Sequence, residues 1–340
     1  MGYADNRKII DRGKKGCGEP FDVSVIILTY HPSWMKLCGT LLSAIRQEGL
    51  SIEVLLSDDG SADNCQEKAK AFLSSQSFEN IQYLPWEKNE GTVANLRKAL
   101  EKAQGRYTYT ISPGDYFYDT NTLRLLTDFC DERNAEICFG EAVYYSRKED
   151  GTITLPPDRL QAPSRSGLYR FNNRHWQKTA FMFLDYILGA AYFYRTDILR
   201  EYIDRIRNLV RYAEDTPSTL FALADGISVR FFPRPVVWYE CGTGISDGDN
   251  GKWRQILKNE YCCTYNALKE AYPKDSVVRA AWRYKVQKEE KEPVWKQALV
   301  APFTVWIFYC QRIFRQKKNY STKEYYEKLN IFFSELSALF

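Results

Sequence analysis

Short apolar runs alternate with helical segments along the first third of the chain. The first run, residues 23–30, is rich in β-branched residues and apolar at nearly every position, which is typical of a strand buried on both faces of a parallel sheet. Similar runs at residues 52–56, 81–84 and 107–111 predict three further strands, and the segments between them carry apolar residues at helical spacing. The last of these helices is expected to end at Gly105, because glycine favours the position after a helix C-terminus. This repeat of strand and helix predicts an α/β fold with a parallel sheet.

The pattern changes after residue 135. Residues 137–145, 188–194 and 229–239 are expected to be extended, whereas residues 196–210 have the spacing of a helix. Residues 151–176 form a connection that is rich in Pro, Arg and Asn and long enough to be a functional loop.

The C-terminal part of the chain is expected to be helical and basic. Residues 251–340 contain 17 Lys and Arg against 9 Asp and Glu, whereas the preceding residues are acidic overall. Residues 297–311 are apolar and uncharged, but they are interrupted by Pro302 and are shorter than the roughly 20 residues of a spanning helix. Basic residues follow as far as position 318, which is typical of an interfacial anchor on an anionic membrane. A buried helix that packs on the α/β domain is the alternative.

Composition excludes several classes of protein. Apolar residues make up 44% and aromatic residues 15% of the chain, which excludes a disordered protein. The net charge of only +4 argues against a nucleic-acid partner. The nine cysteines include no C-x-x-C pair and there are two histidines, so neither a disulfide scaffold nor a Cys/His zinc site is expected. Residues 1–20 lack the apolar core of a signal peptide, and we expect a cytoplasmic protein with free thiols.

Acidic and hydroxyl side chains follow three of the predicted strands. They are Thr29 and Tyr30 after the first strand, Asp58 and Asp59 after the second, and Asp115 after the fourth. In open α/β sheets, ligands bind beyond the carboxyl ends of the strands. The chain has neither the G-x-G-x-x-G nor the G-K-[ST] pattern of phosphate-binding loops. A diphosphate would therefore need a divalent cation, Mg²⁺ or Mn²⁺, held by a carboxylate such as Asp115.

Six stretches of the chain carry a pattern that none of them would establish alone. They are VSVIILTY (23–30), EVLLSDDGSADN (53–64), NEGTVANLRKALEKAQGRY (89–107), ISPGDYF (111–117), LGAAYFYRTDIL (188–199) and AEDTPSTLFAL (213–223). Together, and in this order, they resemble family 2 glycosyltransferases of the GT-A fold, and most closely the bacterial enzymes that build capsule, exopolysaccharide or lipopolysaccharide.

The resemblance implies a division of the chain into three parts. Residues 1–21 are an N-terminal arm, residues 22–250 are a GT-A domain, and residues 251–340 are a helical, basic extension. The GT-A fold is a Rossmann-like mixed sheet, mostly parallel, with flanking helices. The implied reaction moves a sugar from a nucleotide diphosphosugar, usually a UDP-sugar, to an acceptor with inversion at the anomeric carbon.

The resemblance assigns several residues to the nucleoside. Asp59 matches the family position that hydrogen-bonds uracil, since a carboxylate can accept the imide N–H. Thr29 and Tyr30 match the loop beneath the nucleobase. Asp58 is left open between ligand contact and capping of the following helix.

Further matches concern the diphosphate and the sugar. Asn89, Gly91 and Asn95 match a loop that contacts the nucleoside and diphosphate, and for Gly91 a need of backbone geometry alone is the alternative. Gly189 matches a strand that lines the donor sugar and the acceptor. Ser246 lies in a glycine-rich stretch that resembles a loop able to order over the diphosphate, for which a plain surface loop is the alternative.

Asp115 matches the last acidic residue of the family's D-x-D-type metal motif. Ser112 and Gly114 stand where aspartate is common, so this motif is incomplete. One carboxylate together with diphosphate oxygens and waters can still bind Mn²⁺ or Mg²⁺, and we expect weaker metal binding than a full motif gives. The alternative is that Asp115 serves only the turn after Pro113 and Gly114.

Glu214 and Asp215 match the family's acidic pair, whose aspartate is the usual catalytic base. An inverting transfer is a single in-line displacement, so one base must take the proton of the acceptor hydroxyl as the new bond forms. We assign this role to Asp215, with Glu214 as the second candidate. Pro217 suits the first turn of a helix, so an acidic helix N-terminus is the alternative for the pair.

The sequence therefore predicts an inverting, metal-assisted glycosyltransferase. We expect it to act on a glycan or lipid-linked acceptor in cell-surface polysaccharide synthesis, at the inner face of the cell membrane if residues 297–318 bind there. One alternative, motivated by the incomplete metal motif, is a catalytically silent module that binds nucleotide sugars. A nucleotidyltransferase is a third possibility, but the basic glycine-rich signature usual near its first strand is not present.

Overall fold

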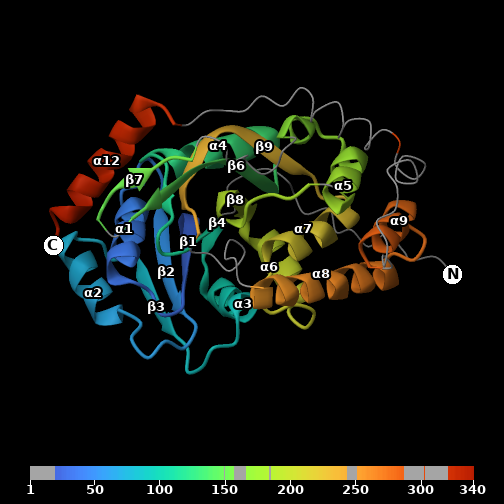
Figure 1. Ribbon diagram of the computed structural model, residues 1–340, viewed down its shortest axis with the longest axis horizontal. Helices are drawn as coiled ribbons and strands as arrows, with labels where there is room; N and C mark the ends of the chain where they lie inside the picture. The colour runs from blue at the N-terminus through green and yellow to red at the C-terminus, as the bar shows by residue number, and fades with distance from the viewer. Residues whose placement is uncertain are drawn as a thin grey trace.

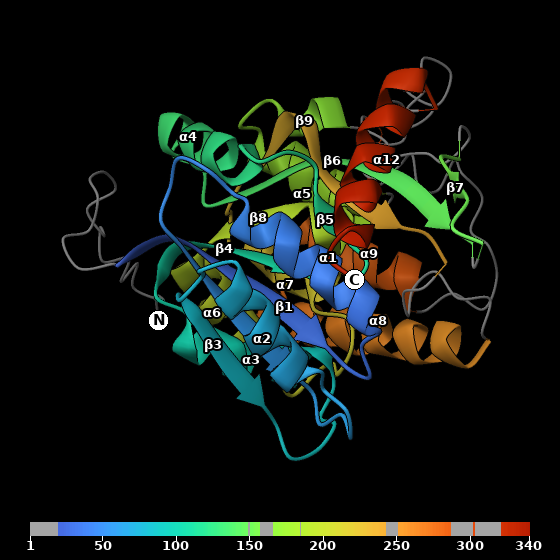
Figure 2. The ribbon, with the colours of Figure 1, turned by 90° about the vertical axis from the view of Figure 1, so that its left-hand side faces the viewer.

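The described residues form an α/β structure around a nine-stranded sheet with strand order β3–β2–β1–β4–β8–β6–β9–β5 and with β7 paired to β6. The structure is a computed structural model. It describes residues 20–148, 150–156, 166–183, 185–242, 251–286, 302 and 321–340. Helices cover both faces of the sheet (Figures 1 and 2). The predicted α/β class is confirmed.

The apolar runs of the first third of the chain form the parallel half of the sheet. Its strands are β1 (Phe21–Thr29), β2 (Ile52–Asp58), β3 (Ile81–Pro85) and β4 (Gly105–Ile111). They are connected by α1 (Trp34–Ile45), α2 (Gln66–Ser75) and α3 (Thr92–Lys102). Because these strands run the same way, their carboxyl ends meet at one edge, where Thr29 is paired with Asp58.

The other half of the sheet is mixed. β6 (Ile137–Arg147) lies between the antiparallel β8 (Tyr192–Arg195) and the parallel β9 (Val229–Glu240). Two short strands, β5 (Tyr116–Phe117) and β7 (Ile153–Thr154), pair with β9 and β6 respectively. The helices of this half are α4 (Thr122–Arg133), α5 (Arg174–Phe183), α6 (Thr196–Ile206) and α7 (Asp215–Ala224), with the 3₁₀ turns η1 (Ser166–Tyr169) and η2 (Gly189–Ala191).

The central strand β1 contributes side chains to two hydrophobic cores, one on each face of the sheet. Ile26 packs in the core that α3, α6 and α7 cover, whereas Val25 and Ile27 pack in the core that α1, α2 and α4 cover. All three side chains are fully buried. Alternate side chains of a strand point to opposite faces, so a strand covered on both sides must be apolar at successive positions.

Gly105 is not the predicted helix C-cap. Helix α3 ends at Lys102, and Gly105 is the first residue of β4. A Cβ atom at position 105 would lie 2.3 Å from the backbone nitrogen of Ser24 in β1. The close approach of two strands, rather than a helix end, is therefore what requires glycine here.

Two helices of the mixed half were not predicted. In α4, Leu123, Leu126 and Cys130 have helical spacing and are buried. Within residues 151–176, expected to be a loop, the described residues form β7, η1 and the first turn of α5. Many side chains of both helices are buried, so tertiary packing contributes to the stability of α4 and α5.

The C-terminal helices pack on opposite sides of the domain (Figure 1). Helices α8 (Gly251–Ala271) and α9 (Ser276–Lys285) extend the core beneath α5, α6 and α7. Helix α12 (Lys323–Ser337) packs on α1 and the β5 edge, where it buries Leu329, Phe333 and Leu336. These parts of residues 251–340 therefore share hydrophobic cores with the preceding chain.

The predicted membrane anchor falls outside the described residues. Of residues 297–318 the structure describes only Pro302, so neither the anchor nor the buried-helix alternative is tested. Most of the N-terminal arm, residues 1–19, also lies outside the described part. Among the helices that the structure describes, none has the length and apolar character needed to cross a bilayer.

We predict that Phe333→Ala lowers the free energy of unfolding by about 3 to 5 kcal/mol, because the buried ring packs against Tyr116 and Tyr145. Ile331→Ala, on the same helix but 60% exposed, should change it by less than about 1 kcal/mol. Urea denaturation of both variants measures the difference. Equal, small losses would contradict the packing of α12 on the domain.

Candidate active site

The Asp58 side chain joins the carboxyl ends of β1 and β2. Its oxygens accept hydrogen bonds from the Thr29 hydroxyl (2.8 Å) and from the N–H and hydroxyl of Ser61 (2.7 Å each). Asp58 and Thr29 are buried, so these bonds satisfy groups that water does not reach. Tyr30 follows directly and is 53% exposed, which leaves its ring accessible at this edge. Asp58 therefore orders the turn, whereas Tyr30 is available to a ligand.

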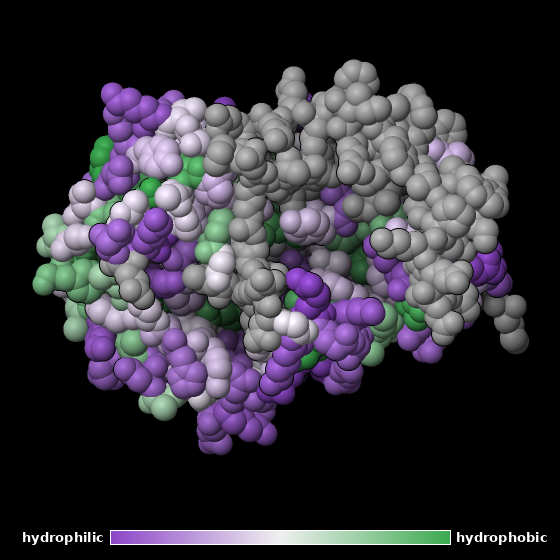
Figure 3. All heavy atoms as spheres, viewed as in Figure 1, coloured by the Kyte–Doolittle hydropathy of each residue, from purple (hydrophilic) through white to green (hydrophobic). Residues whose placement is uncertain are grey.

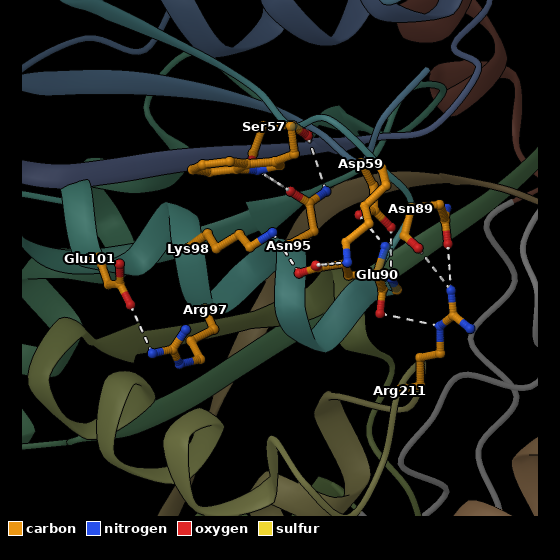
Figure 4. Close-up of polar contacts among 12 residues, drawn as sticks. Ser57, Asp59, Asn89, Glu90, Asn95, Arg97, Lys98, Glu101 and Arg211 are labelled. Atoms are coloured by element: carbon orange, nitrogen blue, oxygen red, sulfur yellow. Dashed lines mark hydrogen bonds and ion pairs between the residues drawn. The ribbon is translucent and has the colours of Figure 1, made fainter. Parts of the chain in front are cut away.

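Asp59 organises the loop before α3. One carboxylate oxygen accepts the N–H of Glu90 (2.9 Å) and the other accepts the N–H of Gly91 (2.8 Å) (Figure 4). Asp59 is buried, and its two bonds fix residues 89–91 over the end of β2. Each carboxylate oxygen can accept a further hydrogen bond, so the predicted contact with a base stays a prediction.

Asn95 ties α3 to the end of β2. Its amide oxygen accepts the Ser57 hydroxyl (2.5 Å) and the Trp86 indole N–H (3.0 Å), and its NH₂ group donates to the Ser57 carbonyl (3.2 Å) (Figure 4). The residue is buried. These bonds give Asn95 a clear role within the protein, and its predicted contact with the diphosphate stays a prediction.

Arg211 was not singled out in the sequence, yet it completes the same loop. Its guanidinium donates to the backbone and side-chain oxygens of Asn89 (3.0 and 2.9 Å) and to the Glu90 carbonyl (3.2 Å) (Figure 4). Its own carbonyl accepts the Val93 N–H (3.0 Å). Gly91 has a φ of +96°, and a Cβ atom there would lie 2.3 Å from Cγ of Arg211. The structure thus shows a conformational and steric need for glycine at position 91.

The turn that carries Asp115 is held from two directions. The Asp115 N–H donates to the Ser112 carbonyl (3.0 Å), and the Thr40 hydroxyl of α1 donates to the Asp115 carbonyl (2.9 Å). One oxygen of the Asp115 carboxylate accepts the N–H of Glu240 (3.0 Å) at the end of β9. The Glu240 carboxylate is paired with Lys36 (2.6 Å). Asp115 is buried but lies at the same sheet edge as Asp58 and Asp59.

These residues fit a divalent cation only with help from a ligand. Among the described residues no group of three or more His, Cys, Asp or Glu side chains is placed to hold a metal ion. Mg²⁺ and Mn²⁺ in nucleotide sites are, however, often bound by one or two carboxylates together with phosphate oxygens and waters. Asp115, whose carboxylate accepts the Glu240 N–H at 3.0 Å at this edge of the sheet, suits that arrangement.

Glu214 and Asp215 stand at the start of α7. The Asp215 carboxylate accepts the N–H of Thr216 (2.5 Å). Burial raises the pKa of both carboxyls, and the neighbouring Asp215 charge adds to the effect on Glu214, whose pKa reaches about 8. The bond from Thr216 favours the charged form of Asp215. Asp215 therefore ionises first and Glu214 retains its proton at neutral pH, an arrangement often found at catalytic sites.

Gly189 lies against the Asp215 carboxylate. A Cβ atom at position 189 would lie 3.1 Å from an Asp215 carboxylate oxygen. The next residue, Ala190, accepts the Tyr109 hydroxyl (2.5 Å) through its carbonyl, which connects η2 to β4. Since Asp115 follows β4, these contacts bring Gly189 and Asp215 to the same end of the sheet as Asp115. Figure 3 shows a hollow near the middle of the face in view, with both hydrophilic and hydrophobic residues at its border.

The stretch with Ser246 is not among the described residues, which are interrupted between 242 and 251.

The structure brings the predicted site residues together around one end of the sheet. They are the edge with Thr29, Asp58 and Asp59, the 89–91 loop, Asp115 and the Glu214–Asp215 pair. Arg211 is the residue that the sequence did not indicate. A single arginine before an acidic pair carries no motif, and only the fold shows its contact with a loop more than 100 residues earlier.

A profile of glycosyl transferase family 2 matches residues 24–207, more than half of the chain. The chain belongs to glycosyl transferase family 2. It is therefore a glycosyltransferase, as predicted. A search of curated protein sequences gave no match.

Solved glycosyltransferases share its fold at low sequence identity. S. aureus TarS 1-349 in complex with UDP is 17% identical with a TM-score of 0.52, over 84% of this chain and 82% of that chain. The same TarS fragment in complex with UDP-GlcNAc is 16% identical with a TM-score of 0.51, over 86% and 87%. The mannosyltransferase PcManGT from Pyrobaculum calidifontis, in complex with GDP-Man and Mn²⁺, is 13% identical with a TM-score of 0.53, over 94% and 85%. The predicted GT-A fold is confirmed.

In this family 2 glycosyltransferase, Gly91→Ala is expected to destabilise the protein more than Gly226→Ala. Both glycines have positive φ (+96° and +83°), a conformation that costs alanine about 1 to 2 kcal/mol. Only at position 91 would the added methyl group also overlap Arg211, because at position 226 the nearest atom is 4.0 Å away. Urea denaturation measures both losses. Equal losses would contradict the close contact between Gly91 and Arg211.

Proposed function

We propose that this glycosyltransferase moves a sugar from a nucleotide diphosphosugar, in the first instance a UDP-sugar, to an acceptor hydroxyl with inversion at the anomeric carbon. The observation that carries the proposal is the half-buried Glu214–Asp215 pair beside Gly189, at the sheet end that also holds Asp59 and Asp115. The complexes of similar fold with UDP, UDP-GlcNAc and GDP-Man support a nucleotide-sugar donor.

In the proposed reaction Asp215 is the catalytic base. It takes the proton of the acceptor hydroxyl while that oxygen forms a bond to the anomeric carbon. The bond between the anomeric carbon and the diphosphate oxygen breaks on the opposite side, and the nucleoside diphosphate leaves with the electron pair. A base acting in this way contributes about 10²–10⁴-fold to the rate. Gly189 supports the assignment, because a side chain at this position would crowd the Asp215 carboxylate, from which a Cβ atom would lie only 3.1 Å away.

The nucleotide is proposed to bind along the edge formed by β1, β2 and the 89–91 loop. Tyr30 offers an exposed ring to the base, and Asp59 and Arg211 hold Asn89, Glu90 and Gly91 in place. Asp115 would hold Mn²⁺ or Mg²⁺ there together with the diphosphate. A bound cation would neutralise the charge that develops on the leaving diphosphate.

The acceptor and the cellular setting are proposed from the resemblance and the composition. The resemblance to capsule and exopolysaccharide enzymes favours a glycan or lipid-linked acceptor, and by the same resemblance Ser246 is proposed to contact the donor. The apolar and basic composition of residues 297–318 favours attachment to the inner face of the cell membrane.

We predict that Asp215→Asn lowers kcat by about 10²–10⁴-fold and leaves donor affinity near that of the wild type, because the amide cannot accept the proton. Glu214→Gln, which is isosteric with the protonated form of Glu214, should have a much smaller effect near pH 7. A panel of UDP- and GDP-sugars, with and without Mn²⁺, identifies the donor by thermal shift, and release of the nucleoside diphosphate measures turnover.

Two outcomes of this experiment would overturn the proposal. Wild-type protein that binds a nucleotide sugar but neither transfers nor hydrolyses it would instead be the catalytically silent binding module. Asp215→Asn with full turnover would remove Asp215 from the role of base.

We also predict a bell-shaped dependence of kcat/KM on pH. The acid limb reports ionisation of Asp215 and lies above the usual range of an aspartate, because burial raises its pKa. The alkaline limb lies near pH 8, where Glu214 loses its proton and places a second negative charge beside the anionic donor. Glu214→Gln should abolish the alkaline limb and keep the acid limb. An unchanged alkaline limb in this variant would show that another group titrates there.

A further inference from the structure

Helix α8 supplies a buried carboxylate to the segment that leads into the catalytic pair. The Glu260 side chain accepts the backbone N–H groups of Arg211 (2.9 Å), Tyr212 (3.1 Å) and Ala213 (2.8 Å). Glu260 is 9% exposed. Three successive N–H groups therefore converge on one carboxylate, immediately before Glu214.

Within the part of the chain that the structure describes, Glu260 is the acceptor for the N–H groups of residues 211–213. This segment connects α6 to α7 and belongs to neither a helix nor a strand. Buried backbone N–H groups outside regular structure need acceptors, because leaving one unsatisfied costs about 1 to 3 kcal/mol. Ala213 is buried and Tyr212 is half-buried, and Glu260 accepts from both as well as from the exposed Arg211. Glu260 therefore fixes the path of the backbone into Asp215.

Other side chains of α8 face the same region. The Trp253 ring packs edge-on against Tyr212, with centroids 4.9 Å apart. Tyr261 lies beside the acidic pair, whose charges help burial to raise the pKa of its hydroxyl. The Tyr265 hydroxyl donates to the Met182 carbonyl (2.7 Å) and anchors the helix to α5. Helix α8 thus runs along the catalytic segment (Figure 1).

The segment held by Glu260 is also attached to the nucleotide loop. The Arg211 guanidinium bonds to Asn89 and Glu90, and the Arg211 carbonyl accepts the Val93 N–H. A continuous set of hydrogen bonds therefore links α8, the backbone of residues 211–213 and the loop that Asp59 orders. The start of α7 follows this backbone directly.

We propose that Glu260 is a positioning residue for sugar transfer, which holds residues 211–213 so that Asp215 and the 89–91 loop keep a fixed relative placement. The proposal rests on the role of Asp215 as base. The family profile ends at residue 207, so neither α7 nor α8 falls within the match. The function of α8 is assigned here from its contacts alone.

Glutamine is the informative substitution at position 260. It preserves the size of the side chain but offers one oxygen, and its NH₂ group would point at a backbone N–H instead of accepting from it. The backbone of residues 211–213 would then have to shift. A displacement of about 1 Å at a catalytic group can cost about 10²-fold in rate.

The chain offers a matched control for this substitution. Glu53, at the start of β2, is also buried and also accepts backbone N–H groups, those of Gln104 and Gly105. It lies at the amino end of the strand, whereas the site lies at the carboxyl end. Glu53→Gln therefore removes the same kind of interaction away from the catalytic segment.

The experiment compares Glu260→Gln and Glu53→Gln in the full chain. We expect Glu260→Gln to lower kcat by about tenfold to a hundredfold, with UDP affinity, measured by calorimetry, within about twofold of the wild type. Glu53→Gln is expected to lower the melting temperature by a similar or larger amount and to leave kcat unchanged. This split separates a positioning role from a loss of stability.

The pH profile is a second readout. The groups that face Glu214 are Asp215 on α7, Glu260 and Tyr261 on α8, and Tyr194 on β8. The Glu260 charge contributes, after burial and Asp215, to the raised pKa of Glu214. Removing that charge should therefore move the alkaline limb of kcat/KM to lower pH, which Glu53→Gln should not do.

Unchanged kcat and an unchanged pH profile in Glu260→Gln would overturn the proposal. So would a loss of kcat matched by Glu53→Gln at equal loss of melting temperature, since the effect would then be one of stability. If Asp215→Asn retains full turnover, the assignment of Asp215 as the base is wrong, whatever Glu260→Gln does. If Asp215→Asn is inactive and Glu260→Gln is normal, only the positioning role fails.

Discussion

The loops beyond the carboxyl ends of the strands depend on one constraint, the need of buried backbone N–H groups for acceptors. Carboxylates meet this need at three places around the site. Asp59 accepts from residues 90 and 91, Glu260 from residues 211–213, and Asp115 from residue 240. Because each bond joins elements that are far apart in sequence, the same interactions that satisfy the backbone also assemble the site.

The carboxylates of this site differ in how many donors they have. Asp58 and Asp59 are each held by two or more N–H or O–H groups. Asp215 accepts the Thr216 N–H, and beside it lies the half-buried Glu214. Burial raises the pKa of both carboxyls of the pair, and Glu214 keeps its proton at neutral pH. Local environment thus distinguishes the carboxylates that order the loops from the pair that we propose for catalysis.

Much of the fold and part of the site follow from the sequence. The four parallel strands were predictable because continuous apolar runs such as residues 23–30 have few other stable placements. The clustering of Thr29, Asp58, Asp59 and Asp115 at one edge followed from the parallel arrangement. Gly105 was misread because helix ends and close strand contacts both favour glycine, and the choice between them depends on Ser24 in a distant strand. Arg211 and Glu260 act through main-chain atoms of other segments, which leave no pattern in the sequence.

Helix α1 is shaped by two unrelated neighbours. Gly39 lies where a methyl group would overlap the Tyr116 ring and approach Leu336 of α12, and the adjacent Thr40 hydroxyl bonds to the turn of Asp115. Lys36, one turn earlier, pairs with Glu240. Within these five positions of α1, the size, the hydrogen bonding and the charge of the side chains are each set by residues outside the helix. Residues 36–40 should consequently tolerate few substitutions. The same positions contact α12 and the turn of Asp115, so substitutions in α12 are restrained by residues that also support this turn.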